Sequence, residues 1–128
     1  MEIKVKSKSW WGMGSSGGRE NEEVFPIKLK EKRIIKERKF WFNKKKGFIF
    51  KRVVEVESNE LIFAYKVLDV FNDGVKIKIY GSVVEYKPGY LMRSEKDNKP
   101  YYVLKPGEVL KFITPTMDAG DSFELTLV

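Results

Sequence analysis

The stretch LIFAYKVLDVFNDGVKIKIYGSVVEY, residues 61–86, decides the fold class. It holds two runs of β-branched and aromatic residues on either side of Asn72-Asp73-Gly74, a strong signal for a tight turn between strands. One face of the second run is apolar (Val75, Ile77, Ile79 and Val83), while Lys76 and Lys78 alternate with it. The pattern therefore predicts a β-hairpin formed by residues 61–71 and 75–86.

A third β-patterned run, residues 48–57, precedes this hairpin, and Ser58-Asn59 is expected to turn the chain between them. Residues 31–42 are rich in Lys, Glu and Arg, which favour a helix. They also contain Phe40-Trp41-Phe42, which is typical of a strand. We predict a strand here, with a helix as the alternative, and a turn at 43–47.

Shorter alternating runs occupy both ends of the chain, at residues 2–8, 24–30, 101–104, 109–114 and 122–128. Residues 2–8 are expected at a sheet edge, and Pro26 also favours an edge strand because it cannot donate to a ladder. A turn is expected at 115–121. Together these elements predict an all-β protein: a single domain, 1–128, folded as an antiparallel β-sandwich of about eight or nine strands, with a small β-barrel as the alternative.

The 128 residues include neither cysteine nor histidine. This excludes disulfides, thiolate catalysis and zinc–cysteine sites, together with the commonest general base and metal ligand. We expect no cofactor and no metal. Because no apolar run reaches about 18 residues and the start lacks the apolar core of a signal peptide, we expect a cytoplasmic protein without a membrane segment.

Positive charge is concentrated in the first part of the chain. Residues 1–51 hold 15 cationic and 6 acidic side chains, a net charge of +9, whereas residues 52–128 hold 10 and 12, a net charge of −2. Such asymmetry is typical of proteins that bind nucleic acid or an acidic protein. Of the 25 cations, 20 are Lys, and Arg is the preferred residue for forked phosphate and guanine contacts. This balance weakens the case for nucleic acid.

Residues 9–23 are predicted to form a long loop rich in glycine and serine. The stretch from Gly12 to Gly17 fits G-x-G-x-x-G, but a dinucleotide loop must open a helix, and the segment that follows is patterned as a strand. We therefore do not expect nucleotide binding. Trp10 and Trp11 would face opposite sides of a strand, with one in the core. Alternatively, they and Arg19 form an aromatic binding anchor.

A basic and aromatic block covers residues 28–51, which hold 11 cationic and 2 acidic side chains, a net charge of +9. Cations that follow phosphates and aromatic rings that stack on bases are how single-stranded nucleic acids are bound. In the simpler interpretation, the aromatic residues face the core and the lysines protect a sheet edge. The candidate binding residues in this block are Arg38, Trp41, Lys44, Lys45 and Lys46.

Asp118 and Asp121 are the candidate pair of carboxylates for a catalytic or calcium site, in the turn expected at 115–121. The alternating ligands of a calcium loop are missing around them. Without histidine or cysteine, a carboxylate-based enzyme is the third of our hypotheses. The first is a non-catalytic, macromolecule-binding β-sandwich module, with an acidic protein as the expected partner. The second is a single-stranded nucleic-acid binder that uses residues 28–51. The oligomeric state is left open.

Overall fold

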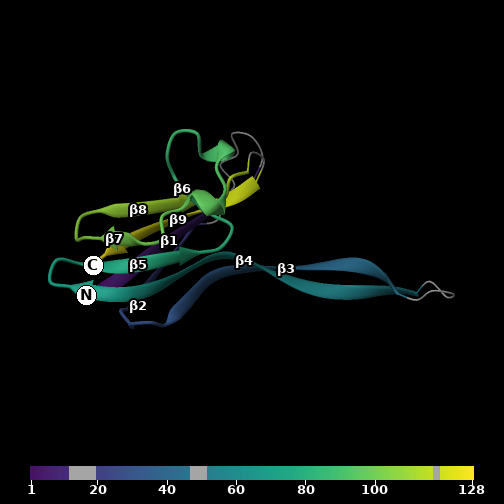
Figure 1. Cartoon of the computed structure of the whole chain (residues 1–128), viewed down its shortest axis with the longest axis horizontal. Coiled ribbons are helices and arrows are strands. Elements are labelled where there is room, and N and C mark those ends of the chain that lie inside the picture. The colour runs from purple at the N-terminus through teal and green to yellow at the C-terminus, as the bar shows by residue number, and fades with distance from the viewer. Residues whose placement is uncertain (12–19, 47–51, 117–118) are drawn as a thin grey trace.

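The computed structural model describes residues 1–11, 20–46, 52–116 and 119–128. The described chain forms a β-sandwich of two antiparallel sheets, with nine strands in all (Figure 1). The five-stranded sheet has the order β2 (Glu20–Pro26), β1 (Glu2–Trp11), β9 (Ala119–Leu127), β8 (Val109–Ile113) and β6 (Val84–Glu85). The four-stranded sheet has the order β3 (Lys32–Lys46), β4 (Arg52–Phe71), β5 (Gly74–Tyr80) and β7 (Tyr102–Leu104). The sandwich prediction is confirmed, and the barrel alternative is wrong because the sheets are not closed into one.

The core lies between the inner faces of the two sheets. Phe63 of β4 stacks on Phe123 of β9, with ring centroids 4.4 Å apart, and it lies 5.9 Å from the ring of Phe112 on β8. Alternate residues of the strands supply the remaining buried side chains, as a half-buried sheet requires. These include Ile3, Val5, Tyr65, Val67, Val75, Ile77, Tyr102, Leu104, Leu125 and Leu127.

The hairpin at the centre of the sequence is confirmed: β4 and β5 pair from Ala64↔Tyr80 to Phe71↔Gly74. The second strand ends earlier than expected, at Tyr80, because the chain bends at Gly81. Gly81 has a φ of +115° and lies so close to β4 that a Cβ atom would be 2.3 Å from the carbonyl oxygen of Ile62. Only glycine fits this conformation and this approach.

The expected turn at Ser58-Asn59 is wrong, because β4 is a single strand of 20 residues. The expected turn at 43–47 is also wrong for its described part, since residues 43–46 belong to β3. Both segments pair with each other in one long hairpin, in which Lys39 faces Asn59 and Lys46 faces Arg52. Cross-strand pairing has thus overridden local turn preference. The strand predicted for 31–42 is confirmed.

The N-terminal strands differ from the prediction in length and position. β1 is not at an edge, because it lies between β2 and β9. Residues 9–11 and 20–23, expected in the loop, extend β1 and β2. Residues 9–11 extend β1 because they pair with β9, from Ser9↔Asp121 to Trp11↔Ala119. Residues 20–23 pair with β1, where Lys4 lies 2.9 Å from Glu22 and Lys6 lies 2.8 Å from Glu20. Pro26 lies in an edge strand, as expected. The strand predicted over 24–30 is wrong in its second half, because β2 ends at Pro26.

The C-terminal half follows the predicted strands closely. The two short helical turns η1 (Tyr90–Met92) and η2 (Glu95–Asp97) connect β6 to β7. The turn expected at 115–121 is shorter than predicted, because β9 already begins at Ala119. This shift places Asp121 inside a strand, where it is buried rather than exposed on a turn.

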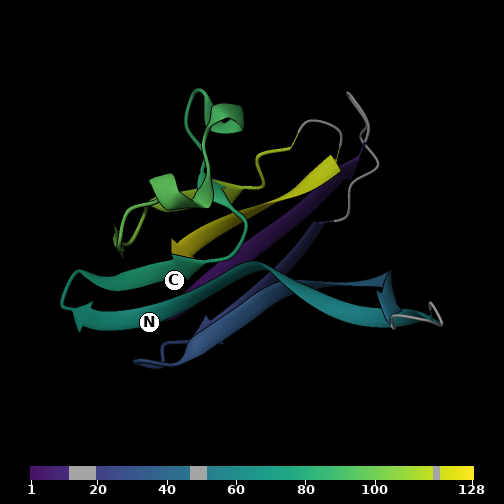
Figure 2. The ribbon, with the colours of Figure 1, turned by 45° about the vertical axis from the view of Figure 1, so that its right-hand side comes forward.

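The hairpin β3–β4 continues beyond the sandwich as a projecting arm (Figures 1 and 2). At its base, β4 is shared with β5, whose pairing with β4 begins at Ala64↔Tyr80. From that point toward Arg52, the described partner of β4 in strand pairing is β3 alone. The arm is therefore a two-stranded extension of the four-stranded sheet.

Two buried tyrosines, Tyr65 and Tyr102, are expected to make the stability of the fold depend on pH in the alkaline range. Burial raises the pKa of Tyr102, and burial also raises the pKa of Tyr65, against the opposing charge of Arg33. A tyrosine whose pKa is higher in the folded than in the unfolded state stabilises the fold at pH values below its unfolded pKa of about 10. This stabilisation is lost as the pH rises from the unfolded pKa through the raised folded pKa. We expect the free energy of unfolding to fall above about pH 10.

Urea unfolding between pH 8 and pH 11 measures this effect. Tyr102→Phe is expected to reduce the alkaline loss of stability, because phenylalanine has no hydroxyl to ionise. Tyr86→Phe, at an exposed position, serves as the matched control and should leave the pH profile of the wild type unchanged. Identical alkaline slopes for wild type and Tyr102→Phe would contradict the prediction.

Candidate binding site at the base of the basic arm

Strand β3, which runs from the sandwich into the arm, is strongly basic. Strand β3 alone holds eight cationic side chains and one acidic side chain, Glu37. Its net charge of +7 equals the net charge of the whole chain. The rest of the protein is therefore neutral in total, and the positive charge follows one strand.

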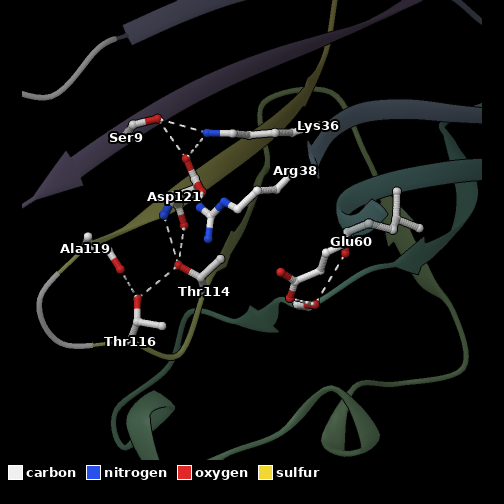
Figure 3. Close-up of polar contacts among 10 residues, drawn as sticks. Ser9, Lys36, Arg38, Glu60, Thr114, Thr116, Ala119 and Asp121 are labelled. Carbon is white, nitrogen blue, oxygen red and sulfur yellow. Dashed lines mark hydrogen bonds and ion pairs between the residues drawn. The ribbon is translucent and has the colours of Figure 1, made fainter. Parts of the chain in front are cut away.

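A β-bulge marks the base of β3. The β3–β4 register shifts between Ile34 and Lys36 and again between Lys36 and Glu37. A bulge places an extra residue in one strand and redirects its side chain. Here the unpaired residues are Ile35 in β3 and Ile62 in β4, and Lys36 lies between the two shifts, opposite Phe63. Its Nζ atom forms an ion pair with Asp121 Oδ1 and also lies 3.3 Å from Ser9 Oγ (Figure 3).

Asp121 is the buried acceptor of this cluster, with 2% of its surface exposed. Ser9 Oγ donates to Asp121 Oδ1 over 2.7 Å, and Arg38 Nη2 lies 3.4 Å from Oδ2. A buried carboxylate is costly unless charged partners and hydrogen-bond donors compensate it. Because Ser9 and Asp121 belong to one sheet and Lys36 and Arg38 to the other, the cluster joins the two sheets where the arm leaves the sandwich.

The loop before β9 is fixed by hydroxyl groups. The Asp121 backbone N–H donates to Thr114 Oγ1 over 2.9 Å, and Thr116 Oγ1 donates to the carbonyl oxygen of Ala119. Gly120 lies between them: a Cβ atom there would be 2.3 Å from Thr114 Oγ1 and 2.7 Å from Trp10 Cζ2. A glycine at this position is what allows the tryptophan ring to pack against the loop.

A cleft of about 330 Å³ opens beside this cluster. Guanidinium and carboxylate groups line it together with apolar residues, Ile62 and Pro115 among them. Glu60 Oε1 accepts a hydrogen bond of 3.2 Å from Ser82 Oγ (Figure 3). Arg93 is held by the carbonyl oxygens of Glu85 and Asp97. The lining residues are Arg38, Glu60, Ile62, Ser82, Arg93, Ser94, Glu95, Thr114, Pro115, Thr116, Ala119 and Gly120.

The structure brings two of the predicted binding residues to this end of the sandwich. Arg38 lines the cleft, and Trp10 is half-buried against its Gly120 wall. Trp41 and the lysines 44–46 occupy positions in β3, with Trp41 opposite Glu57, and their side chains lie outside the described part. Trp11 pairs with Ala119 in the strand ladder, and its side chain is likewise not described. Arg19 and Gly12 to Gly17 lie outside the described residues.

Sequence reasoning missed the partners of Asp121. Lys36 and Asp121 are 85 residues apart, and no local pattern links them. Of the paired carboxylates proposed for a catalytic site, Asp118 lies outside the described residues. The oxygens of Asp121 already contact Ser9, Lys36 and Arg38. This arrangement suits a structural clamp, since a general base needs a free oxygen near a substrate.

The described residues contain no group of three or more acidic side chains that could hold a metal ion. Within the same residues, no helix is long and apolar enough to cross a membrane. Comparisons with family models, with curated proteins and with solved structures find no match to this chain. Function must therefore be argued from the arm and the cleft at its base.

Proposed function

We propose that the protein is a non-catalytic binding module whose arm engages an acidic protein. One observation carries the proposal: strand β3 holds the entire net charge of the chain and continues outside the sandwich on a two-stranded arm (Figure 1). A hairpin that projects from the sandwich adds little to the core. Its charge raises the rate of encounter with an acidic partner and helps to orient it.

An acidic protein suits the arm better than nucleic acid. Six of the eight cations in β3 are Lys, whereas forked contacts to phosphate favour Arg. The outer part of β4 also carries acidic residues, with Glu55 opposite Asn43 and Glu57 opposite Trp41. The two strands of the arm thus hold residues of both charges, which a protein surface of mixed charge matches better than a uniformly anionic phosphate backbone does.

The cleft at the base of the arm supports the same function. Its lining combines charged groups of both signs with apolar residues, as in sites that fix the orientation of a bound segment by a few polar contacts. Trp10, predicted as an aromatic anchor, is half-buried against Gly120, so the proposal rests on the arm and the cleft. A cytoplasmic location, suggested by the lack of cysteine, is part of the proposal.

Charge reversal on the arm tests this function, with poly-L-glutamate and single-stranded DNA as probes. The triple variant Lys44→Glu, Lys45→Glu, Lys46→Glu is expected to weaken poly-L-glutamate binding at least tenfold and to flatten its dependence on salt. The control triple variant Lys87→Glu, Lys96→Glu, Lys105→Glu changes exposed lysines outside the arm and has the same net charge of +1. It should bind within about twofold of the wild type.

The outcomes separate three cases. The proposal is supported if the arm variant loses binding of poly-L-glutamate and the control variant keeps it. Tighter binding of single-stranded DNA that survives near-physiological salt and is lost in the arm variant would replace the acidic protein with a nucleic acid. Equal losses in the two triple variants would mean that binding follows net charge, and the arm would then have no special role.

A further inference from the structure

In the part of the chain that the structure describes, no strand pairs with the outer edge of β3. β3 is the terminal strand of the four-stranded sheet, and its pairing with β4 extends from Lys32↔Lys66 to Lys46↔Arg52. In an antiparallel pair, alternate residues direct their N–H and C=O groups away from the partner strand. A strand of 15 residues therefore presents an edge of roughly 50 Å to another chain.

The base of this edge is closed by the fold itself. The bulge around Lys36 interrupts the regular pattern, and bulges are one way in which proteins block edge pairing. Arg33 lies over the ring of Phe25 at 4.5 Å, which brings β2 next to this part of β3. Lys30 N–H donates to the carbonyl oxygen of Val67, which holds the chain that leads into β3.

From Glu37 to Lys46 the register is continuous, with no shift. These ten residues run out along the arm, away from the five-stranded sheet (Figure 2). They hold five cations and one acid, a net charge of +4. This segment combines an unbroken edge with a positive charge, whereas the base of β3 has a bulge.

We propose that an acidic, extended segment of the partner adds as a β-strand to the outer edge of β3 at residues 37–46. The inference rests on the proposed function and names its mode of binding. Backbone hydrogen bonds to the open edge supply affinity, and acidic side chains opposite the cations supply selectivity. A second copy of this chain is disfavoured, because pairing β3 with β3 would bring together two strands of net charge +7 each.

Three peptides test this mode on the full-length protein. The first alternates Glu with Thr over ten residues. The second has two N-methyl groups at positions i and i+2, which block one edge of the peptide and leave the other free. The third has them at i and i+1, which blocks both edges with the same composition and charge.

We expect the first two peptides to bind with similar affinity and the third to bind about tenfold more weakly. Amide hydrogen exchange in residues 37–46 should slow when the first peptide binds. Equal binding of the second and third peptides would overturn strand addition, and binding of poly-L-glutamate in the same experiment would show that the proposed function still holds. If neither the peptides nor poly-L-glutamate bind, both proposals fail. Preferred binding of single-stranded DNA would also overturn both.

Discussion

Lys36→Met is expected to lower the free energy of unfolding by about 2–3 kcal/mol, because it leaves the buried carboxylate of Asp121 without its closest cation. Methionine keeps the length and apolar stem of lysine, so the loss reports the charge. The Lys36 side chain is 35% exposed. This exposure places the expected effect below the roughly 3–5 kcal/mol typical of a fully buried pair.

Lys4→Met is the matched control. Lys4 is exposed to a similar degree and also forms a short ion pair, 2.9 Å from Glu22, but the Glu22 side chain is 51% exposed, whereas that of Asp121 is 3% exposed. The same substitution there should cost less than about 1 kcal/mol. Urea unfolding of both variants at neutral pH measures the difference. A cost for Lys36→Met no greater than that of Lys4→Met would contradict the role of the inter-sheet cluster.

The double variant Lys36→Met, Asp121→Asn extends this test. It removes both charges of the pair and should be less destabilised than the sum of the two single variants. Strict additivity would mean that the two side chains do not depend on each other. Because the cluster lies where the arm leaves the sandwich, its loss is also expected to speed amide exchange at the base of β3.

The sequence predicts those parts of the fold whose signals are local. The hairpin at Asn72-Asp73-Gly74 could be recognised because its turn chemistry and the alternation on both sides agree. The arm could not be delimited in this way. Ser58-Asn59 has the composition of a turn, yet on a strand outside the sandwich polar residues are as favourable as apolar ones. Pairing with β3 therefore decides the structure there.

The charge of the candidate site was visible in the sequence, but its geometry was not. The basic block at 28–51 could be counted directly, and most of its charge lies on the single strand β3. The burial of Asp121 depends on Ser9 and Lys36, which lie 112 and 85 residues away along the chain. Such partners are brought together only by the packing of two sheets, so local composition predicted an exposed turn instead.

Phe63→Ala is expected to have the largest effect on stability, a loss of about 3–5 kcal/mol in the free energy of unfolding. Phe63 is fully buried, and its ring contacts Phe123 and Phe112 of the opposite sheet. Truncation to alanine removes these contacts and leaves a cavity that the two sheets can close only in part. Chemical unfolding measured by fluorescence or circular dichroism gives the loss.

Phe71→Ala is the control on the same strand, because Phe71 lies at the end of β4 and is 40% exposed. It should cost less than about 1 kcal/mol. Equal costs at the two positions would contradict the placement of Phe63 at the centre of the core.

The pair of core and arm variants also separates stability from function. β4 contributes Phe63 to the core and also forms one strand of the arm, so the two regions share a backbone. Phe63→Ala should lower stability while the protein that remains folded binds poly-L-glutamate as the wild type does. The triple lysine variant of the arm should show the opposite behaviour, with weaker binding at nearly unchanged stability. If Phe63→Ala also reduced binding under conditions where it is fully folded, the arm would depend on the core for its conformation, and binding would not be a property of its charge and open edge alone.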